Sequence, residues 1–183
     1  PCRPWCLAFG ATCCINDGNP AGSKQRPDWG VLWRFVARHR VTFFGAGAAY
    51  FANCMKAGLV AKDCGDLSRV RALGSTGSPL AEEVQRWGTR QLLEAGSKEV
   101  WWCNISGGTD FCGAFVGGHR ELPEVPGPMP CRELGHAGEA RNEQGRPGVG
   151  EAGELVCTQP LPSMPPSFCG HEGNARYLSR HFA

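Results

Sequence analysis

The sequence lacks the closely spaced ligand pairs that hold structural zinc. Its 183 residues include 11 cysteines, but no two of them form a Cys-x-x-Cys pair, and the 5 histidines add no pair at metal-ligand spacing. The number of cysteines is odd, and several lie inside apolar runs, such as Cys13, Cys14 and Cys103. We therefore expect no structural metal, and we expect buried free thiols in a protein of a reducing compartment.

Long apolar runs and clusters of basic residues are also missing. No run approaches the roughly 20 apolar residues of a membrane-spanning helix, and the first residues do not have the layout of a signal peptide. The net charge is only +2 and the arginines are scattered, which argues against binding to nucleic acid. We therefore expect a cytoplasmic protein whose partners are small molecules, with neither nucleic acid nor membrane among them.

Two catalytic motifs are absent, and a third is incomplete. The sequence contains neither the Gly-x-Ser-x-Gly turn of serine hydrolases nor a phosphate loop that ends in Gly-Lys-Ser/Thr. Gly45 and Gly47 follow an apolar run and precede a helix, as in a dinucleotide-binding fingerprint, but Tyr50 stands where the third glycine would pack. A Rossmann-type oxidoreductase therefore stays an alternative that rests only on these two glycines.

What the sequence does contain is an alternation of apolar runs and amphipathic helices. With 42% hydrophobic and 20% charged residues, its composition is that of an ordinary globular domain. Strands are predicted at residues 7–16, 41–44, 70–73 and 100–103. Helices are predicted between them, over 29–39, from 48 to a stop at Gly58, and over 79–94. Asp28 and Ser78 are the predicted N-caps. This alternation predicts an α/β fold with a mostly parallel sheet flanked by helices.

The composition of the sequence changes after Gly118. Pro-rich and Gly-rich connections surround short extended runs, with a turn at residues 142–145 and a strand at 154–158. We expect residues 1–118 to form the α/β part, and residues 119–183 to form a small antiparallel or barrel-like β subdomain of the same domain. The chain begins with Pro1 rather than Met, so we also expect it to be a piece of a longer protein.

The most informative stretch runs from residue 100 to residue 115. An apolar run ends there in a polar, glycine-rich segment made of Asn104, Ile105, Ser106, Gly107, Gly108, Thr109 and Asp110. In an open α/β sheet, ligands bind at the carboxyl ends of the strands. The two glycines let the backbone approach a ligand, the hydroxyls can hydrogen-bond to it, and the carboxylate suits Mg²⁺. These are the parts of a nucleotide site, although the same residue types also make ordinary turns.

A second glycine-rich junction, Gly74-Ser75-Thr76-Gly77-Ser78-Pro79, follows the preceding strand. It is one of several motifs that occur in a fixed order, at residues 71–80, 105–110, 114–118, 150–156 and 162–165. In this order and spacing the sequence resembles the adenylate-forming acyl-CoA synthetase superfamily, and within it the enzymes that activate acetoacetate. The resemblance covers nearly the whole chain and implies part of an adenylate-forming-enzyme domain.

The resemblance implies a role for each junction. The adenine of ATP would pack on Gly77, Ser78 and Pro79. The α-phosphate and the acyl group would be wrapped by Asn104, Ile105, Ser106, Gly107, Gly108 and Thr109. As catalytic residues, Thr109 would contact the phosphate and Asp110 would be the acid linked to Mg²⁺. Related acetate-activating enzymes carry an aromatic residue where Gly107 stands, so this glycine implies room for a longer acid such as acetoacetate.

The implied reaction joins acetoacetate to CoA in two steps and consumes ATP. The carboxylate first attacks the α-phosphorus of MgATP to give an acyl-adenylate and pyrophosphate, and the CoA thiol then displaces AMP. The sequence does not contain the upstream phosphate loop, the downstream ribose-binding acid, the hinge, or the terminal domain with its catalytic lysine. A non-catalytic remnant that binds nucleotide weakly at most therefore stays the main alternative.

Overall fold

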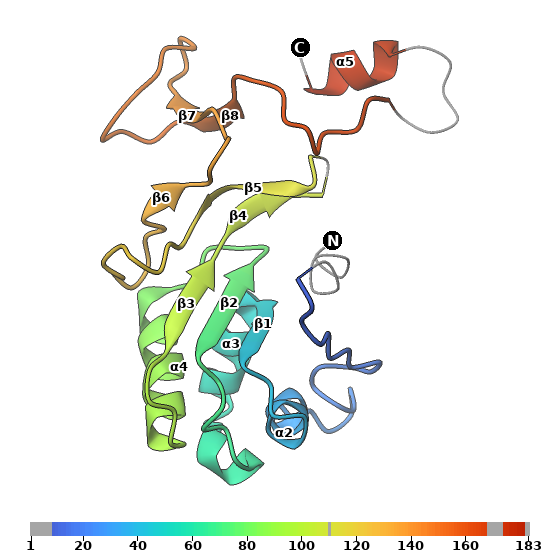
Figure 1. Ribbon diagram of the computed structural model, residues 1–183, viewed down its shortest axis with the longest axis vertical. Helices are drawn as coiled ribbons and strands as arrows, with labels where there is room; N and C mark the ends of the chain where they lie inside the picture. The colour runs from blue at the N-terminus through green and yellow to red at the C-terminus, as the bar shows by residue number, and fades with distance from the viewer. Residues whose placement is uncertain (1–8, 110, 168–173, 182–183) are drawn as a thin grey trace. The chain divides into compact units, whose positions relative to one another are not determined.

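The computed structural model describes residues 9–109, 111–167 and 174–181 (Figure 1). By its internal contacts the chain divides into two compact units. The first unit combines Pro1–Ser106 with Val116–Glu133, and the second combines Gly107–Phe115 with Leu134–Ala183. The chain thus passes between the units more than once, whereas the sequence predicts a single boundary at residue 118. None of the helices among the described residues is long and apolar enough to cross a bilayer.

The first unit is built on a three-stranded parallel sheet. Its strands are β1 (Phe43–Gly47), β2 (Ala72–Thr76) and β3 (Trp101–Asn104), and they lie in that order. Phe43 is in register with Ala72, which is in register with Trp101, so the strands start together. Because the strands are parallel, their carboxyl ends also meet at one edge. The predicted α/β fold with a parallel sheet is confirmed.

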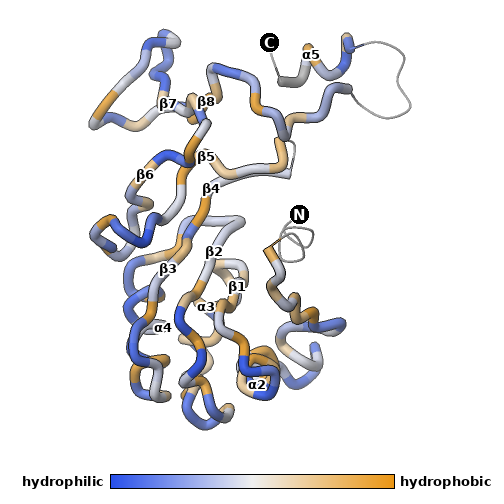
Figure 2. Tube along the Cα trace, in the orientation of Figure 1, coloured by the Kyte–Doolittle hydropathy of each residue, from blue (hydrophilic) through white to orange (hydrophobic). Residues whose placement is uncertain are grey.

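Three helices pack with the sheet, and the last two of them connect its strands. They are α2 (Val31–Arg38), α3 (Ala48–Lys56) and α4 (Glu82–Glu94), with a short 3₁₀ helix η1 (Ala61–Cys64) before β2. In Figure 1, α3 and α4 lie behind the sheet. The predicted inward residues of α4, Leu80, Val84 and Trp87, are all buried. The core of the unit forms between the helices and the sheet, where Trp33 meets Phe44 edge to face at 5.1 Å. Figure 2 shows the hydrophobic residues recurring along these elements.

Both predicted N-caps are wrong. Helix α2 starts after Gly30, and α4 starts after Ala81; neither cap residue provides a side-chain hydrogen bond. Asp28 instead accepts a hydrogen bond from the Gly30 N–H at 2.9 Å and pairs with Arg34. Ser78 cannot cap α4 because β2 runs on to Thr76 and Pro79 still belongs to the connection that follows it. The helix therefore begins later than the Ser-Pro pair indicates.

The first predicted strand, at residues 7–16, is also wrong where it is described. Residues 9–16 form a turn and irregular backbone, and the Phe9 side chain is 80% exposed. An apolar run forms a strand only where its backbone N–H and C=O groups can pair with a neighbouring strand, and none lies beside this run among the described residues. The eight described cysteines are free, but Cys54 is the one of them that is buried, while Cys14 and Cys112 are exposed. The prediction of buried thiols therefore holds for Cys54 and fails for the exposed ones.

Short strands make up the rest of the chain. A second sheet has the order β4-β5-β6, with β4 (Ser106–Gly108), β5 (Gly113–Gly117) and β6 (Cys131–Arg132). The strands β7 (Gly138–Arg141) and β8 (Glu154–Cys157) form an antiparallel pair, followed by helix α5 (Ala175–His181). The predicted strand at 154–158 and the turn at 142–145 are confirmed, the turn by a bond from Gly145 N–H to the Asn142 carbonyl at 2.8 Å. The described strands make small antiparallel sheets rather than a barrel.

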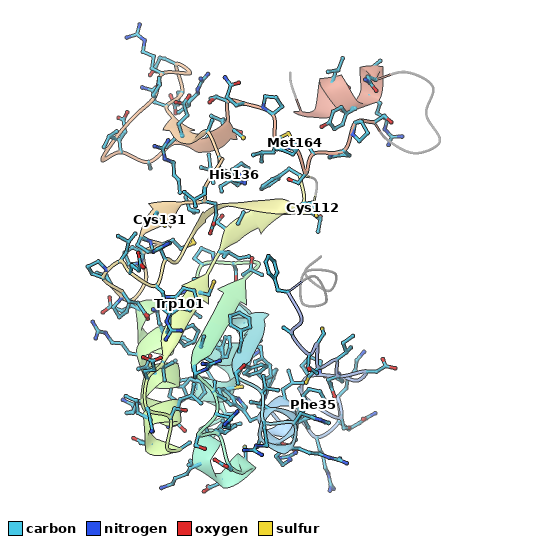
Figure 3. All side chains as sticks on the ribbon, viewed as in Figure 1. Phe35, Trp101, Cys112, Cys131, His136 and Met164 are labelled. Carbon is cyan, nitrogen blue, oxygen red and sulfur yellow. The ribbon has the colours of Figure 1, made fainter. Side chains whose placement is uncertain are left out.

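The second unit has a small aromatic cluster of its own. The rings of Phe111 and Phe115 lie 4.4 Å apart, and His136, which is labelled in Figure 3, is 5.7 Å and 5.9 Å from them. The Ser163 hydroxyl donates to the Phe111 carbonyl at 2.6 Å. These contacts join residues far apart in the sequence, and they stabilise the unit around the β4–β5 turn.

Candidate functional site

The two glycine-rich junctions meet at the carboxyl edge of the parallel sheet. Ser75 at the end of β2 is in register with Asn104 at the end of β3. The Ile105 N–H donates to the Ser75 carbonyl at 3.0 Å, so the ladder extends one residue beyond β3. The junction with Gly77, Ser78 and Pro79 and the start of the Asn104 segment are therefore neighbours, at the edge where an open α/β sheet binds its ligands.

This edge holds two buried polar atoms that are free to bind a ligand. Ser75 is 5% exposed and Asn104 is 9% exposed. Within the described part of the chain, neither the Ser75 hydroxyl nor the Asn104 Oδ1 atom has a hydrogen-bond partner. Leaving a buried polar group unpaired costs about 1–3 kcal/mol, so native proteins rarely keep such atoms without a use. A ligand with hydrogen-bonding groups would satisfy both.

A shallow groove lies beside Ser78 and Pro79 of the second glycine-rich junction. Gly77, Ser78 and Pro79 are exposed, and Gly77 has a φ of +91°, a conformation that glycine adopts without strain. The groove encloses about 160 Å³ and is lined by Ala48, Ala49, Ala52, Ser78, Pro79, Leu80, Ala81 and Val84. Complete ligand pockets usually measure about 300–1,000 Å³, so this groove has room for only part of a nucleotide.

Two helices begin at the same edge of the sheet. Helix α3 starts after Gly47 and α4 after Ala81, and neither start is capped by a side chain. Uncapped N–H groups and the helix dipole make such ends weakly attractive to anions. Together with the groove, this favours a ligand that carries negative charge.

Ser106, the first residue of β4, still belongs to the first unit, whereas Gly107, Gly108 and Thr109 belong to the second. Gly107 and Gly108 lie in β4, so the segment that the sequence predicts as a loop is partly a strand. A Cβ atom at Gly107 would lie 2.1 Å from the Gly113 carbonyl oxygen and 2.7 Å from the Ala114 Cα, so only glycine lets β4 pass this closely over β5. Thr109 is exposed, and its carbonyl accepts from the Cys112 N–H at 3.3 Å. Asp110, the predicted Mg²⁺ ligand, lies outside the described residues.

Sequence reasoning missed two residues that contact the site. Gln85 on α4 accepts a hydrogen bond from the Asn104 side chain at 3.2 Å, and it donates one to Glu124 at 3.0 Å. A signal for Gln85 was present, because it is a polar residue on the buried stripe of α4 next to Val84. Glu124 gave no signal, since it lies in an irregular segment far along the chain.

Two nearby side chains argue against a cysteine nucleophile and against a dinucleotide-binding turn. Burial, together with the charge of Glu133, raises the pKa of the Cys103 thiol, so this thiol is protonated at neutral pH and is a poor nucleophile. Tyr50, at the position of the third fingerprint glycine, is buried and donates its hydroxyl to the Trp29 carbonyl at 2.8 Å. A bulky buried ring there does not fit a dinucleotide-binding turn, so the oxidoreductase alternative is not favoured.

Comparisons with known proteins first concern the fold. No protein-family model matches the chain. The structure matches that of an anthranilate CoA ligase with a TM-score of 0.64 over 81% of this chain and 26% of the ligase, at 18% identity. At that identity the likeness shows the fold alone.

The more similar proteins are acetoacetyl-CoA synthetases. The solved acetoacetyl-CoA synthetase from Streptomyces lividans matches with a TM-score of 0.82 and 35% identity, over 94% of this chain and 26% of that one. The acetoacetyl-coenzyme A synthetase of Rhizobium meliloti (strain 1021) is 39% identical over 176 residues, which is 96% of this chain and 26% of the relative. The chain is thus homologous to a segment of these synthetases and spans about a quarter of their length. The resemblance predicted from the sequence is confirmed.

Proposed function

We propose that the chain is part of an ATP-dependent acetoacetate-CoA ligase. The observation that carries the proposal is the similarity to acetoacetyl-CoA synthetases, which runs through both glycine-rich junctions. The reaction forms an acyl-adenylate from acetoacetate and ATP with release of pyrophosphate, and CoA then displaces AMP. A cytoplasmic location stays a prediction that rests on the composition.

The nucleotide would lie at the carboxyl edge of the parallel sheet. The two unpartnered atoms, Ser75 Oγ and Asn104 Oδ1, supply hydrogen-bonding groups there, and the groove beside Ser78 and Pro79 has room for part of the base or the ribose. An apolar wall of small side chains suits the flat face of an adenine ring. These features support the role that the resemblance gives to Gly77, Ser78 and Pro79.

The phosphates would be held by the segment that follows Asn104. Thr109 is exposed, so its hydroxyl is accessible to a phosphate oxygen. Asp110 would bind Mg²⁺, which neutralises charge on the phosphates when it is bound. Ser106, Gly107 and Gly108 would supply backbone N–H groups and let the chain approach the α-phosphate and the acyl group closely, whereas the N–H of Ile105 already donates to the Ser75 carbonyl.

The acid substrate is proposed to be acetoacetate. The argument from the sequence is that Gly107 leaves space where an aromatic ring closes the pocket of acetate-activating enzymes. The close contact between Gly107 and Gly113 adds a second reason for this glycine that has nothing to do with the substrate. Substitution of Gly107 is therefore a poor test of acyl size, because even alanine would push β4 away from β5.

The decisive test is made at Thr109, in a complete ligase that carries this segment. Thr109→Ala removes a hydroxyl that contacts phosphate in the proposed site, and loss of one such group costs about 100-fold or more in rate. Acetoacetate-dependent exchange of pyrophosphate into ATP measures the adenylation step directly. Thr158→Ala, at an exposed threonine that bonds to the Ala137 carbonyl, is the matched control. Equal exchange rates in the two variants would contradict the proposed role, and a parent without exchange would favour the non-catalytic remnant.

A further inference from the structure

Gln85 is the polar exception among the most deeply buried side chains of the first unit. It is 2% exposed, like the large apolar side chains around it. Its carbonyl oxygen accepts two hydrogen bonds, from the Asn104 side-chain nitrogen at 3.2 Å and from the Gly127 N–H at 3.0 Å. Its side-chain nitrogen donates to Glu124 at 3.0 Å. A buried amide with this many partners is held in one orientation.

Glu124 anchors this arrangement from outside the sheet. One carboxylate oxygen accepts from Gln85, and the other accepts from the backbone N–H of Trp102 at 3.1 Å. Trp102 belongs to β3, which pairs with β2 on one side only within its sheet. Glu124 therefore satisfies an N–H on the free edge of β3 and faces α4 at the same time. The residue itself lies on an exposed segment, so it can be substituted without opening the core.

The donors and acceptors of these groups force a single orientation for Asn104. A carboxylate only accepts hydrogen bonds, so the NH₂ group of Gln85 must face Glu124. The Gln85 oxygen then faces Asn104, and the NH₂ group of Asn104 must face Gln85. Its oxygen, Oδ1, is left pointing away from the pair, and this is the buried atom without a partner. The Glu124 carboxylate and the Gly127 N–H, which donates to the Gln85 oxygen, thus favour the same orientation of Gln85, and Gln85 in turn orients Asn104.

We propose that Glu124 and Gln85 are positioning residues that make Asn104 present its oxygen, and not its nitrogen, to the nucleotide base. An amide oxygen accepts a hydrogen bond from an amino group and is mismatched with a carbonyl oxygen. The pair therefore selects a 6-aminopurine, as in ATP, over a 6-oxopurine, as in inosine triphosphate. This inference rests on the proposed function, because it assumes that a nucleoside triphosphate binds at this edge with its base, rather than its α-phosphate, toward Asn104 Oδ1.

The first experiment measures the ratio of kcat/KM for ATP to kcat/KM for inosine triphosphate in a complete ligase that carries this segment. Glu124→Gln replaces one acceptor oxygen by an NH₂ group, so the residue can no longer accept from both the Trp102 N–H and the Gln85 side chain. The orientation of Gln85 is then supported only by the Gly127 N–H. The ratio is expected to fall about tenfold, the effect of one well-placed hydrogen bond. In the exchanged variant Gln85→Glu with Glu124→Gln, position 85 is again a pure acceptor toward Asn104. The ratio is expected to return to within about threefold of the parent.

A control variant distinguishes an effect on the orientation of Asn104 from a general loss of protein stability. Gln91→Glu makes the same substitution on the same helix at another buried glutamine, whose oxygen accepts from the Ala61 N–H at 2.8 Å. It is expected to leave the nucleotide ratio unchanged even if it lowers the melting temperature. If Glu124→Gln lowers kcat/KM equally for both nucleotides, or if the exchanged variant does not recover the ratio, the positioning role is wrong.

A second experiment distinguishes failure of the inference from failure of the proposed function. If the parent ligase activates no acid with either nucleotide, the proposed function fails, and amide exchange in the 183-residue chain still tests the pair. Glu124→Gln should speed hydrogen exchange at the N–H groups of Trp102 and Gly127, whereas Gln91→Glu should not. Unchanged exchange at both amides would overturn the arrangement itself.

Discussion

Gly88 lies on α4 where the indole ring of Trp102 packs against the helix. A Cβ atom there would come within 2.6 Å of Cζ2 and 3.1 Å of Cη2 of that ring. Alanine favours a helix by about 1 kcal/mol over glycine, but overpacking a core costs about 1–3 kcal/mol. The ring cannot move easily, because Trp102 is 2% exposed and its indole N–H is held by Thr89 at 2.9 Å. We therefore expect Gly88→Ala to destabilise the chain by about 1 kcal/mol or more.

Urea denaturation followed by tryptophan fluorescence measures this change. Gly18→Ala is the control, because the nearest atom to an added Cβ there is the Asn16 side-chain nitrogen at an ordinary 3.6 Å. The control should shift the midpoint little. A Gly88→Ala variant that is as stable as the parent would mean that helix propensity outweighs the contact with Trp102.

Single residues also show where sequence reasoning reaches its limit. The glycine-rich segments were found because strands that end in Gly, Ser and Thr are visible in one stretch of sequence. Glu124 could not be found, because it lies 39 positions after Gln85 in the sequence and only the fold brings the two together. Gly107 was found, but its contact with Gly113 depends on the pairing of β4 and β5, which the sequence alone does not specify.

Helix α3 makes the stability of the first unit depend on pH. Tyr50 and Cys54 on this helix both contact the Trp29 carbonyl, the hydroxyl at 2.8 Å and the thiol at 3.8 Å. Burial raises the pKa of both groups above their ordinary values of 10.0 and 9.0. The folded chain then holds protons that the unfolded chain has already released. The stabilising contribution is therefore complete below about pH 9 and declines as the pH rises toward the folded pKa values.

Denaturation midpoints between about pH 7 and pH 10.5 measure this dependence. We expect the free energy of unfolding to be level at the lower end and to fall at the upper end. Cys54→Ala should flatten the fall that begins near pH 9, and Tyr50→Phe should flatten the part above about pH 10. If the variant with both changes loses stability as steeply as the parent, other groups control the alkaline transition.

At the level of elements, the sequence predicted the periodic burial pattern of a helix correctly, but it misplaced where a helix begins. The pattern of Leu80, Val84 and Trp87 identified the buried face of α4, because a helical period is a local property. Its start was misplaced, since β2 and the turn at Gly77 reach further than the Ser-Pro pair indicates. The strand expected at residues 7–16 was apolar enough, but it has no neighbour among the described strands.

For the molecule as a whole, we expect the 183-residue chain to form no acetoacetyl-CoA by itself. The chain spans about a quarter of the length of the synthetases that it matches, and its sequence does not contain the phosphate loop and the catalytic lysine that the resemblance implies. Incubation with acetoacetate, MgATP and CoA, followed by detection of the thioester, tests this. A complete relative assayed in parallel shows that the conditions support the reaction. Thioester formed by the chain at a rate that Thr109→Ala abolishes would contradict the expectation.

The order of strands in the parallel sheet has a consequence for how the protein is made. β1, β2 and β3 lie side by side in the order in which they occur in the sequence, so every new strand pairs with the one before it. Pairing between successive strands keeps the closed loops shorter than pairing between more distant strands would. The sheet can therefore grow strand by strand while the chain leaves the ribosome, before Leu134–Ala183 of the second unit has been synthesised.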